Sequence, residues 1–383
     1  MKYNFIICHY SEIGLKGKNR KFFEEKLIKN IKRSLNSDSY DFVKRISGRI
    51  LIKIKDKINQ EEIEQSLKNI FGIAYFSFAV NCLQEIGEIK KKSFEILRDK
   101  KFKTFKVDTK RAEKSFSLTS QQINEQVGEY IFEKLSPKIR VNLNSPNITC
   151  FIEVVEKYAF LFLEKIQGLG GLPVGVSGKA ISLLSGGIDS PVSSFYGMKR
   201  GVEMIFLHFY TNKNFLEKIR KNIEALNKYQ FKSEFYLVPF LDIQKNIFQK
   251  TNPELGCILC RRFMFRIAEI LAKKKGASAL FTGENIGQVA SQTLSNMKTI
   301  ENSINIPVLK PLIGMDKEDI IEKAKQIGTF NISILKEEFY CQNFLAKHPE
   351  TKADLKKVVI EEEKIEVQKL IEQAIKKIKV EKI

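Results

Sequence analysis

Residues 179–192 read KAISLLSGGIDSPV, and they decide the fold of the larger part of the chain. Residues 180–184 form an apolar run typical of a buried strand, and residues 191–200 have the spacing of a helix. The turn between them is Ser185-Gly186-Gly187-Ile188-Asp189-Ser190. In α/β folds such a turn lies where the carboxyl end of a strand opens onto the ligand crevice. We therefore expect an α/β domain with an anion site at this turn.

The residues of the turn indicate which anion it binds. Two adjacent glycines predict a backbone with positive φ that presents successive N–H groups to a phosphate. Ser190 is expected at the N-cap and Pro191 at the first helical position, so that the helix dipole faces the same anion. Asp189 is a candidate organiser of Mg²⁺ or substrate. The run matches neither the GxGxxG nor the Walker A spacing, and the alternative is an ordinary Gly-Gly turn with an Asp-Ser cap.

From this turn onward, strand and helix patterns alternate. Such alternation predicts a doubly wound parallel sheet joined by right-handed crossovers. Strands are expected at 180–184, 204–209, 234–239 and 279–282. Helices are expected at 191–200, 215–229, 261–275, 286–297 and 317–327, with a charge-alternating terminal helix over 351–383.

The residues before the turn have a different organisation. Strand patterns at 4–9 and 49–54 and helix patterns at 20–35 and 61–69 suggest a small α+β unit, and a second set follows from residue 81. The Gly-rich run GLGGLPVGVSG is typical of a linker. The expected division is 1–57, 58–167, a linker at 168–178, and an α/β domain at 179–383.

Composition points to an anionic partner. The chain has 383 residues, 43% of them hydrophobic, and a formal net charge of +20. Residues 1–56 carry 14 basic and 6 acidic side chains, and residues 89–114 carry 11 and 4. We expect a polyanion to bind there, although an AT-rich genome would also favour lysine. No apolar run approaches the roughly 20 residues of a membrane span, and no signal peptide is recognisable, so we expect a cytoplasmic protein.

Further motifs suggest a family. They are YSEIGLKGKNR at 10–20, Ser47-Gly48-Arg49, TGENIGQVASQT at 282–293 and KPLIGMDKE at 310–318. The SGGIDS turn resembles the pyrophosphatase loop of the ATP pyrophosphatases, and together the motifs resemble the ThiI family of tRNA 4-thiouridine synthetases from end to end. The resemblance implies a ferredoxin-like domain and a THUMP domain that hold the tRNA acceptor arm. It also implies a catalytic domain of the adenine nucleotide alpha hydrolase type that adenylates uridine 8 and replaces its O4 by sulfur.

The resemblance also assigns residues. It implies ATP and Mg²⁺ as cofactors, with ATP contacts at Leu183, Leu184, Ser185, Gly186, Gly187, Asp189, Ser190, His208, Phe209, Arg261, Gly283 and Gln292. It assigns adenylation to Asp189 and Lys317 and sulfur handling to Cys341. Lys317 would offset the charge on the α-phosphate as the bond to pyrophosphate breaks. Without the resemblance, Lys317 would be a solvated lysine and His208 a structural hydrogen-bond donor.

The six cysteines fall into two groups. In a reducing compartment they are expected to be ligands or nucleophiles rather than disulfides. Cys257, Cys260 and Cys341 offer three thiolates, which suit a [4Fe–4S] cluster with one open iron for exogenous sulfur. Zinc is less favoured because it would need a fourth ligand, and a CxxC redox pair or persulfide relay stays open. The other cysteines, in apolar strand contexts, are expected to be buried structural thiols.

The expected sulfur route and partners follow from the resemblance. Many members of the family pair the equivalent of Cys341 with a cysteine on an appended rhodanese domain, which we expect this chain to lack. Rhodanese-lacking relatives with this cysteine trio resemble the cluster-dependent thiolases. The expected partners are tRNA, a sulfur donor (a cysteine desulfurase or free sulfide), a second copy in a homodimer and a sulfur-carrier protein of thiamine thiazole synthesis. The alternative is a tRNA-binding module with a vestigial adenylation site.

Overall fold

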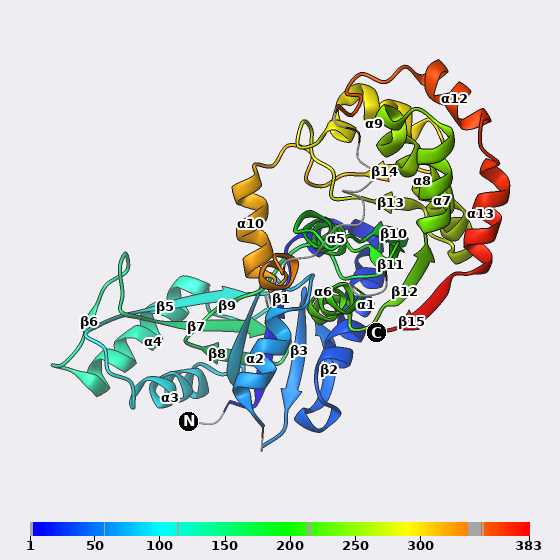
Figure 1. Ribbon diagram of the computed structural model, residues 1–383. Coiled ribbons are helices and arrows are strands. Elements are labelled where there is room, and N and C mark those ends of the chain that lie inside the picture. Colours follow the sequence, from blue (N-terminus) through cyan, green and yellow to red (C-terminus); the bar gives the residue numbers. More distant parts are fainter. Residues whose placement is uncertain (1–2, 57, 113–114, 213–215, 336–345, 347) are drawn as a thin grey trace. The chain divides into compact units, whose positions relative to one another are not determined.

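The computed structural model describes residues 3–56, 58–112, 115–212, 216–335, 346 and 348–383. Its contacts divide the chain into two compact units, Met1–Pro173 and Val174–Ile383. Figure 1 shows the helices and strands of both units. No helix in the described residues is long and apolar enough to cross a membrane.

The first unit is built on one mixed sheet with strand order β2-β3-β1-β4-β8-β7-β5-β6, and β9 pairs with β4. Its strands are β1 (Phe5–His9), β2 (Tyr40–Ile46), β3 (Arg49–Ile54), β4 (Tyr75–Leu83), β5 (Thr104–Arg111), β6 (Arg140–Val141), β7 (Ile148–Val155), β8 (Tyr158–Phe162) and β9 (Ile166–Gln167). Its α-helices are α1 (Arg20–Ser34), α2 (Gln60–Lys68), α3 (Ile86–Leu97) and α4 (Ser120–Leu135).

Strand β4 belongs to both halves of this sheet. Its first part pairs antiparallel with β1, and its last part, from Val80, pairs antiparallel with β8. Helix α2 buries Ile63 and Leu67 in the same core as β1, whereas α3 and α4 bury Ile89 and Ile123 in a second core. A division of the first unit at residue 57 therefore does not coincide with the boundary between these two cores, because α2 packs with the strands that precede it.

The Gly-rich run is packed against both units rather than being an open linker. The N–H of Gly168 donates to the carbonyl of Ala74 at 2.9 Å, and a Cβ at Gly168 would overlap the carbonyl oxygen of Ile73. The N–H of Gly175 donates to the carbonyl of Gly201 at 2.8 Å. The first part of the run thus belongs to the first unit and the last part to the second.

The second unit confirms the predicted parallel sheet. Its strand order is β14-β13-β10-β11-β12-β15, and every described pairing is parallel except that of β15 with β12. Its strands are β10 (Lys179–Leu183), β11 (Glu203–Tyr210), β12 (Glu234–Pro239), β13 (Ala279–Phe281), β14 (Val308–Leu309) and β15 (Lys379–Lys382). Its α-helices are α5 (Asp189–Lys199), α6 (Leu216–Gln230), α7 (Leu241–Lys250), α8 (Gly256–Lys275), α9 (Leu294–Glu301), α10 (Lys317–Gln326), α11 (Phe330–Ser333), α12 (Leu355–Glu363) and α13 (Val367–Lys376).

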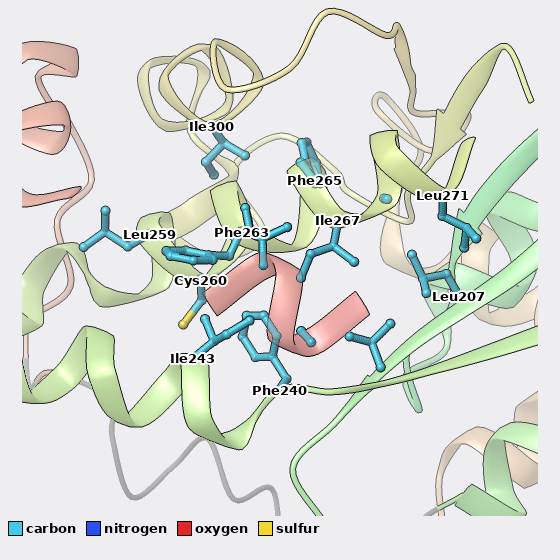
Figure 2. Close-up of a cluster of buried hydrophobic side chains, with 14 of the residues drawn as sticks. Leu207, Phe240, Ile243, Leu259, Cys260, Phe263, Phe265, Ile267, Leu271 and Ile300 are labelled. Atoms are coloured by element: carbon cyan, nitrogen blue, oxygen red, sulfur yellow. The ribbon is translucent and has the colours of Figure 1, made fainter. Parts of the chain in front are cut away.

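Helices cover both faces of this sheet. Helices α7, α8, α12 and α13 close the larger core on one face, and Figure 2 shows part of it, with Phe263 and Ile267 of α8 beside Phe240 and Ile243. On the other face, Phe195 of α5 meets Tyr229 of α6 edge to face, with ring centres 5.0 Å apart. The long helix α8 is thus held by the main core of the unit, and its first turn is in a fixed position.

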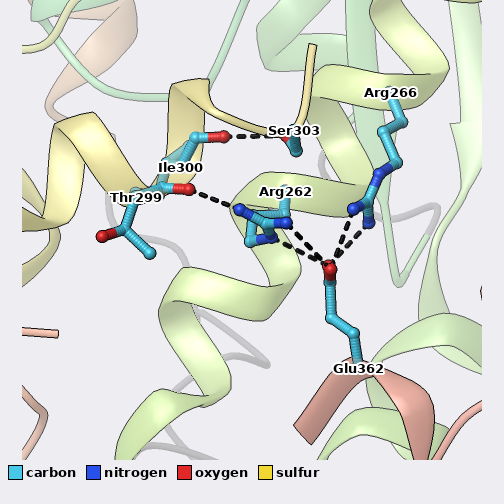
Figure 3. Close-up of polar contacts among 6 residues, drawn as sticks. All are labelled: Arg262, Arg266, Thr299, Ile300, Ser303 and Glu362. Carbon is cyan, nitrogen blue, oxygen red and sulfur yellow. Dashed lines mark hydrogen bonds and ion pairs between the residues drawn. The ribbon is translucent and has the colours of Figure 1, made fainter. Parts of the chain in front are cut away.

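Glu362 of α12 also fixes α8 (Figure 3). Its carboxylate accepts two hydrogen bonds from Arg262, both at 2.9 Å, and two from Arg266 at 2.6 and 2.8 Å. Arg262 also donates to the carbonyl of Thr299. The C-terminal segment is therefore joined to α8 by a buried ionic cluster.

Two expected helices were wrong in extent. The expected terminal helix over 351–383 is α12, α13 and then β15, because the last residues pair with the sheet edge (Tyr236↔Val380). The expected helix at 286–297 begins only at Leu294, where the Thr293 side chain caps it by accepting from the N–H of Asn296 at 3.2 Å. Residues 241–250, for which no helix was expected, form α7.

Candidate active site

The SGGIDS turn lies after β10 and folds back onto the start of α5. The N–H of Ser185 donates to the Ser190 hydroxyl at 2.9 Å, and the N–H of Gly187 donates to the Ser185 hydroxyl at 3.3 Å. The two hydroxyls are 3.0 Å apart. The first N–H groups of a helix have no partner within it, so the start of α5 presents amides to an anion at the carboxyl edge of the sheet.

Two details of the turn differ from the prediction. Helix α5 begins at Asp189, and Ile188 already has helical φ and ψ of −69° and −36°, so Ser190 lies inside the first turn and is not the N-cap. Neither Gly186 nor Gly187 is among the described glycines with positive φ. The Ser190 hydroxyl instead bonds within the turn, accepting from the N–H of Ser185 and donating to the Ser185 carbonyl at 3.3 Å.

Asp189 is the point where three distant motifs meet. Its Oδ1 accepts from Lys317 Nζ at 2.5 Å, across 128 residues of sequence. Its Oδ2 accepts from Gln288 Nε2 at 2.9 Å, across 99 residues. Lys317 is the first residue of α10, and Gln288 lies in the loop after β13. The structure therefore brings Asp189 into contact with Lys317, the two residues to which the resemblance assigns adenylation, and adds Gln288.

Gly283 explains how closely this loop approaches α5. An ideal Cβ at Gly283 would lie 2.6 Å from the nitrogen of Ser190 and 2.7 Å from the carbonyl carbon of Asp189. The Ser193 hydroxyl donates to the carbonyl of Thr282 at 2.7 Å and ties the same two segments together. Only glycine fits between β13 and the first turn of α5.

His208 is held at the end of β11. Its Nδ1 donates to the carbonyl of Leu184 at 2.8 Å, and the N–H of Leu184 donates to the carbonyl of Leu207 at 2.9 Å. Burial lowers the pKa of His208, and the bond to Leu184 only partly opposes this. His208 is therefore a neutral donor that fixes Leu184. Phe209 packs against Phe240, with ring centres 5.3 Å apart.

Glu284 joins two cations beside this loop. Its carboxylate, 3% exposed, pairs with Arg261 of α8 and lies 3.5 Å from Lys310 Nζ. Burial opposes the charge of Glu284, but Arg261 and Lys310 outweigh it and lower the pKa of the carboxyl group. Burial also lowers the pKa of Lys310, with Glu284 acting against it. These residues form a compact charged network at the carboxyl edge of the sheet.

The sequence prediction missed Gln288, Glu284 and Lys310 as individual residues. All three lie within the motifs at 282–293 and 310–318, which the sequence analysis identified without assigning a role to these residues. Gln292, which was predicted, has a buried Oε1 without a hydrogen-bond partner among the described residues.

The cysteine site is described only in part. Cys257 and Cys260 lie in the first turns of α8, which begins at Gly256, so they are within the helix rather than before it. Residues three apart on a helix share a face, so one ion could contact both. Cys260 is buried beside Ile243 (Figure 2). Cys341 lies outside the described residues, and the rest contain no group of three metal-ligating side chains.

The remaining cysteines are buried as expected. Cys8, Cys82 and Cys150 lie in the cores of the first unit. Burial raises the pKa of both Cys82 and Cys150 to about 12, and it raises the pKa of Cys8 as well. These thiols are protonated at neutral pH.

Comparison with known proteins covers the whole chain. The family described as thiamine biosynthesis protein (ThiI) matches residues 175–367, the ThiI ferredoxin-like domain matches residues 5–77, and the THUMP domain matches residues 84–164. The probable tRNA sulfurtransferase of Thermoanaerobacter pseudethanolicus is 41% identical over 96% of this chain and 97% of that protein. The probable tRNA sulfurtransferase of Brevibacillus brevis is 39% identical over 100% of this chain and 97% of that protein.

A solved structure has the same fold. The crystal structure of a 4-thiouridine synthetase in complex with RNA and bound ATP superimposes with a TM-score of 0.90 and 38% identity, covering 100% of both chains. The similarity extends over both units. The chain belongs to the ThiI family.

Proposed function

We propose that the chain is an ATP-dependent tRNA sulfurtransferase that converts uridine 8 of tRNA to 4-thiouridine. The observation that carries the proposal is the contact of Asp189 with Lys317, because it joins the SGGIDS turn to α10 at the carboxyl edge of the sheet. The full-length similarity to a 4-thiouridine synthetase solved with RNA and ATP supports it. Because tRNA is the substrate, the proposal places the enzyme in the cytoplasm.

The residues of the site suit adenylation. O4 of the uridine attacks the α-phosphorus of ATP as the N3 proton passes to solvent, the bond from the α-phosphorus to the bridging oxygen breaks, and pyrophosphate leaves toward the SGGIDS turn and the start of α5. Lys317 stabilises the charge that develops on the α-phosphate. Mg²⁺ bound with ATP would neutralise phosphate charge, and Asp189 is the carboxylate that the site offers to hold it. A sulfur nucleophile then attacks C4, the C4–O4 bond breaks, and AMP leaves.

The sulfur site is a separate part of the proposal. We assign it to Cys257, Cys260 and Cys341, with a [4Fe–4S] cluster as the favoured occupant and zinc as the alternative. The sulfur donor is free sulfide or a cysteine desulfurase. Anaerobic reconstitution with iron and sulfide should give a brown protein with a cluster signal by absorption and electron paramagnetic resonance, and Cys257→Ser should lose it. The buried Cys150→Ser is the control, and a colourless protein with stoichiometric zinc would refute the cluster.

The first unit supplies the RNA surface in this proposal. A hollow of about 800 Å³ is bordered by five exposed cations around Phe102: Arg98, Lys100, Lys101, Lys103 and Lys138. Clustered lysine and arginine side chains of this kind bind phosphates of a nucleic acid backbone. The predicted division assigns these residues to the tRNA-holding domain.

Two further partners follow from the family alone. A homodimer should appear as a species of twice the chain mass in sedimentation. A role with a thiamine sulfur-carrier protein should appear as rescue of a thiazole auxotroph, in keeping with the description of the matching family.

The test of the function is direct. The protein is incubated with tRNA, ATP, Mg²⁺ and sulfide, and the nucleosides are analysed by mass spectrometry. We expect 4-thiouridine from the natural protein and a loss of about 100-fold or more in Asp189→Asn. The matched control is Asp242→Asn, an exposed carboxylate on α7 that is paired with Lys377. Full thiolation by Asp189→Asn would overturn the assignment, and tRNA binding without release of pyrophosphate would favour a vestigial site.

A further inference from the structure

Glu284 is a buried carboxylate with partners from three segments. It follows β13 by three residues, and its side chain is 3% exposed. The Thr282 hydroxyl donates to its Oε2 at 3.1 Å, and Arg261 pairs with its Oε1. Lys310, which follows β14, lies 3.5 Å from Oε2 and also pairs with Glu301. One carboxylate thus joins β13, α8 and the segment after β14.

Burial of the charged Glu284 carboxylate is unfavourable for folding. An ionised carboxylate loses several kcal/mol of hydration on burial, and ion pairs seldom return more than this loss. Replacement of a whole buried ion cluster by well-packed apolar side chains of similar volume is often neutral or stabilising. The charge is therefore better explained by the orientation of its partners than by stability.

Arg261 is the partner that needs orientation. It lies on the first turns of α8, directly after Cys260, and its side chain is 27% exposed. Its guanidinium carbon is 5.4 Å from the ring centre of Phe265, so one face of the group is covered. Its Nε is buried without a hydrogen-bond partner in the described part of the chain. A planar group held at one nitrogen and covered on one face has few remaining orientations.

We propose that Glu284 is a positioning residue of the nucleotide site. Its carboxylate holds Arg261 in the orientation that binds ATP and keeps Arg261 apart from Lys310. This inference rests on the proposed function and concerns a residue that does not itself touch the nucleotide. Arg261 and Lys310 lie 23 and 26 positions from Glu284 in the sequence. The Glu284 carboxylate holds both cations in place before ATP binds. Preorganised charge of this kind costs no reorganisation on binding.

Glu284→Gln tests the proposal because it retains the shape and removes the charge. Loss of one partner of a buried, hydrogen-bonded charge pair lowers binding affinity by roughly 30-fold or more. We expect the KM for ATP in tRNA-dependent pyrophosphate release to rise by about that factor, with kcat within about threefold. A contact made equally in the ground and transition states has this signature. The matched control is Glu301→Gln, which removes the other carboxylate on Lys310 and should change KM by less than about twofold.

A double-mutant cycle separates positioning from a structural role. If Glu284 acts through Arg261, then Glu284→Gln combined with Arg261→Gln should raise KM no further than Arg261→Gln alone. If Glu284 merely stabilises the fold, the two effects should multiply and the midpoint of thermal unfolding should fall in parallel. Should the Gln variant fail to fold, Glu284→Asp supports the same cycle, because it keeps the charge and shortens its reach.

The outcomes distinguish this inference from the function. An unchanged KM in Glu284→Gln, or multiplicative effects in the cycle, would overturn the positioning role while leaving the natural enzyme active. Absence of tRNA-dependent pyrophosphate release from the natural protein would instead overturn the proposed function.

Discussion

At the scale of single residues, the site depends on close approach of backbone to backbone. Gly283 packs on the Asp189–Ser190 peptide, where any Cβ would overlap main-chain atoms. Backbone cannot move aside as the end of a flexible side chain can, so the loop that carries Glu284 and Gln288 would have to shift. Both side chains reach their partners only because Gly283 permits this approach.

Gly283→Ala should therefore weaken both stability and nucleotide binding. Overpacking of this kind costs about 1–3 kcal/mol, which corresponds to a fall in Tm of about 2–4 °C per kcal/mol in a unit of this size. Circular dichroism melting and ATP titration measure the two effects. Gly314→Ala is the control, since no neighbouring atom lies within 4 Å of a Cβ at that position. Its free energy of unfolding should change by no more than about 0.5 kcal/mol. Equal behaviour of the two variants would contradict the packing argument.

At the scale of elements, the decisive contact is between α8 and α12. Helix α8 carries Cys257, Cys260 and Arg261 in its first two turns. Glu362 binds Arg262 and Arg266, which follow them on the same helix. Burial opposes the charge of Glu362, but the two arginines outweigh it and lower the pKa of the carboxyl group. The C-terminal segment thus controls the position of the helix on which the cysteine site is built.

Glu362→Gln should destabilise the second unit by about 3–5 kcal/mol at pH 7, because it leaves the buried Arg262 and the half-buried Arg266 without their carboxylate partner. The folded pKa lies below the ordinary value of 4.5, so the natural ion cluster contributes stability above that pH and loses it as pH falls through the folded pKa. The difference in Tm between natural protein and variant should therefore shrink in acid. Glu363→Gln, the exposed neighbour on α12, is the control. If the difference in Tm between the natural protein and Glu362→Gln does not depend on pH, the ionic cluster is not the source of the stability.

At the scale of the whole molecule, part of the excess positive charge lies together on one surface of the first unit. The hollow of the first unit gathers Lys101, Lys103 and their neighbours on one surface. Lys356 and Lys357 on α12 of the second unit are also exposed, and they do not border this hollow. If charge alone decided RNA binding, both surfaces would contribute alike.

Lys101→Glu/Lys103→Glu should weaken tRNA binding at low salt. It should also lower the slope of log affinity against log salt by about 1 for each backbone phosphate that the variant no longer binds. Filter binding of tRNA over a series of salt concentrations measures both effects. Lys356→Glu/Lys357→Glu makes the same change in net charge and should bind nearly as the natural protein does. Equal weakening in the two double variants would show that only total charge matters.

Local signals in the sequence were enough for much of the fold. The apolar run of β10, the SGGIDS turn and the helix after it are contiguous, so their periodicity and order predicted the parallel sheet and its anion site. The motifs at 282–293 and 310–318 contain the two residues, Gln288 and Lys317, that contact Asp189 in the structure. The conformation of the turn itself was predicted wrongly, because the hydroxyl of Ser190 satisfies the loop rather than capping the helix.

Only the tertiary structure decided which of these loops touch. The contacts of Lys317 and Gln288 with Asp189 and of Glu284 with Arg261, the sharing of β4 between two cores, and the addition of β15 to the sheet edge all join residues far apart in sequence. Periodicity reports which face of an element is buried, but not which partner buries it. The sequence alone therefore determined the elements and the loop chemistry. Packing determined the site, because hydrogen bonds and ion pairs form only where the folded sheet brings the loop ends within about 3 Å.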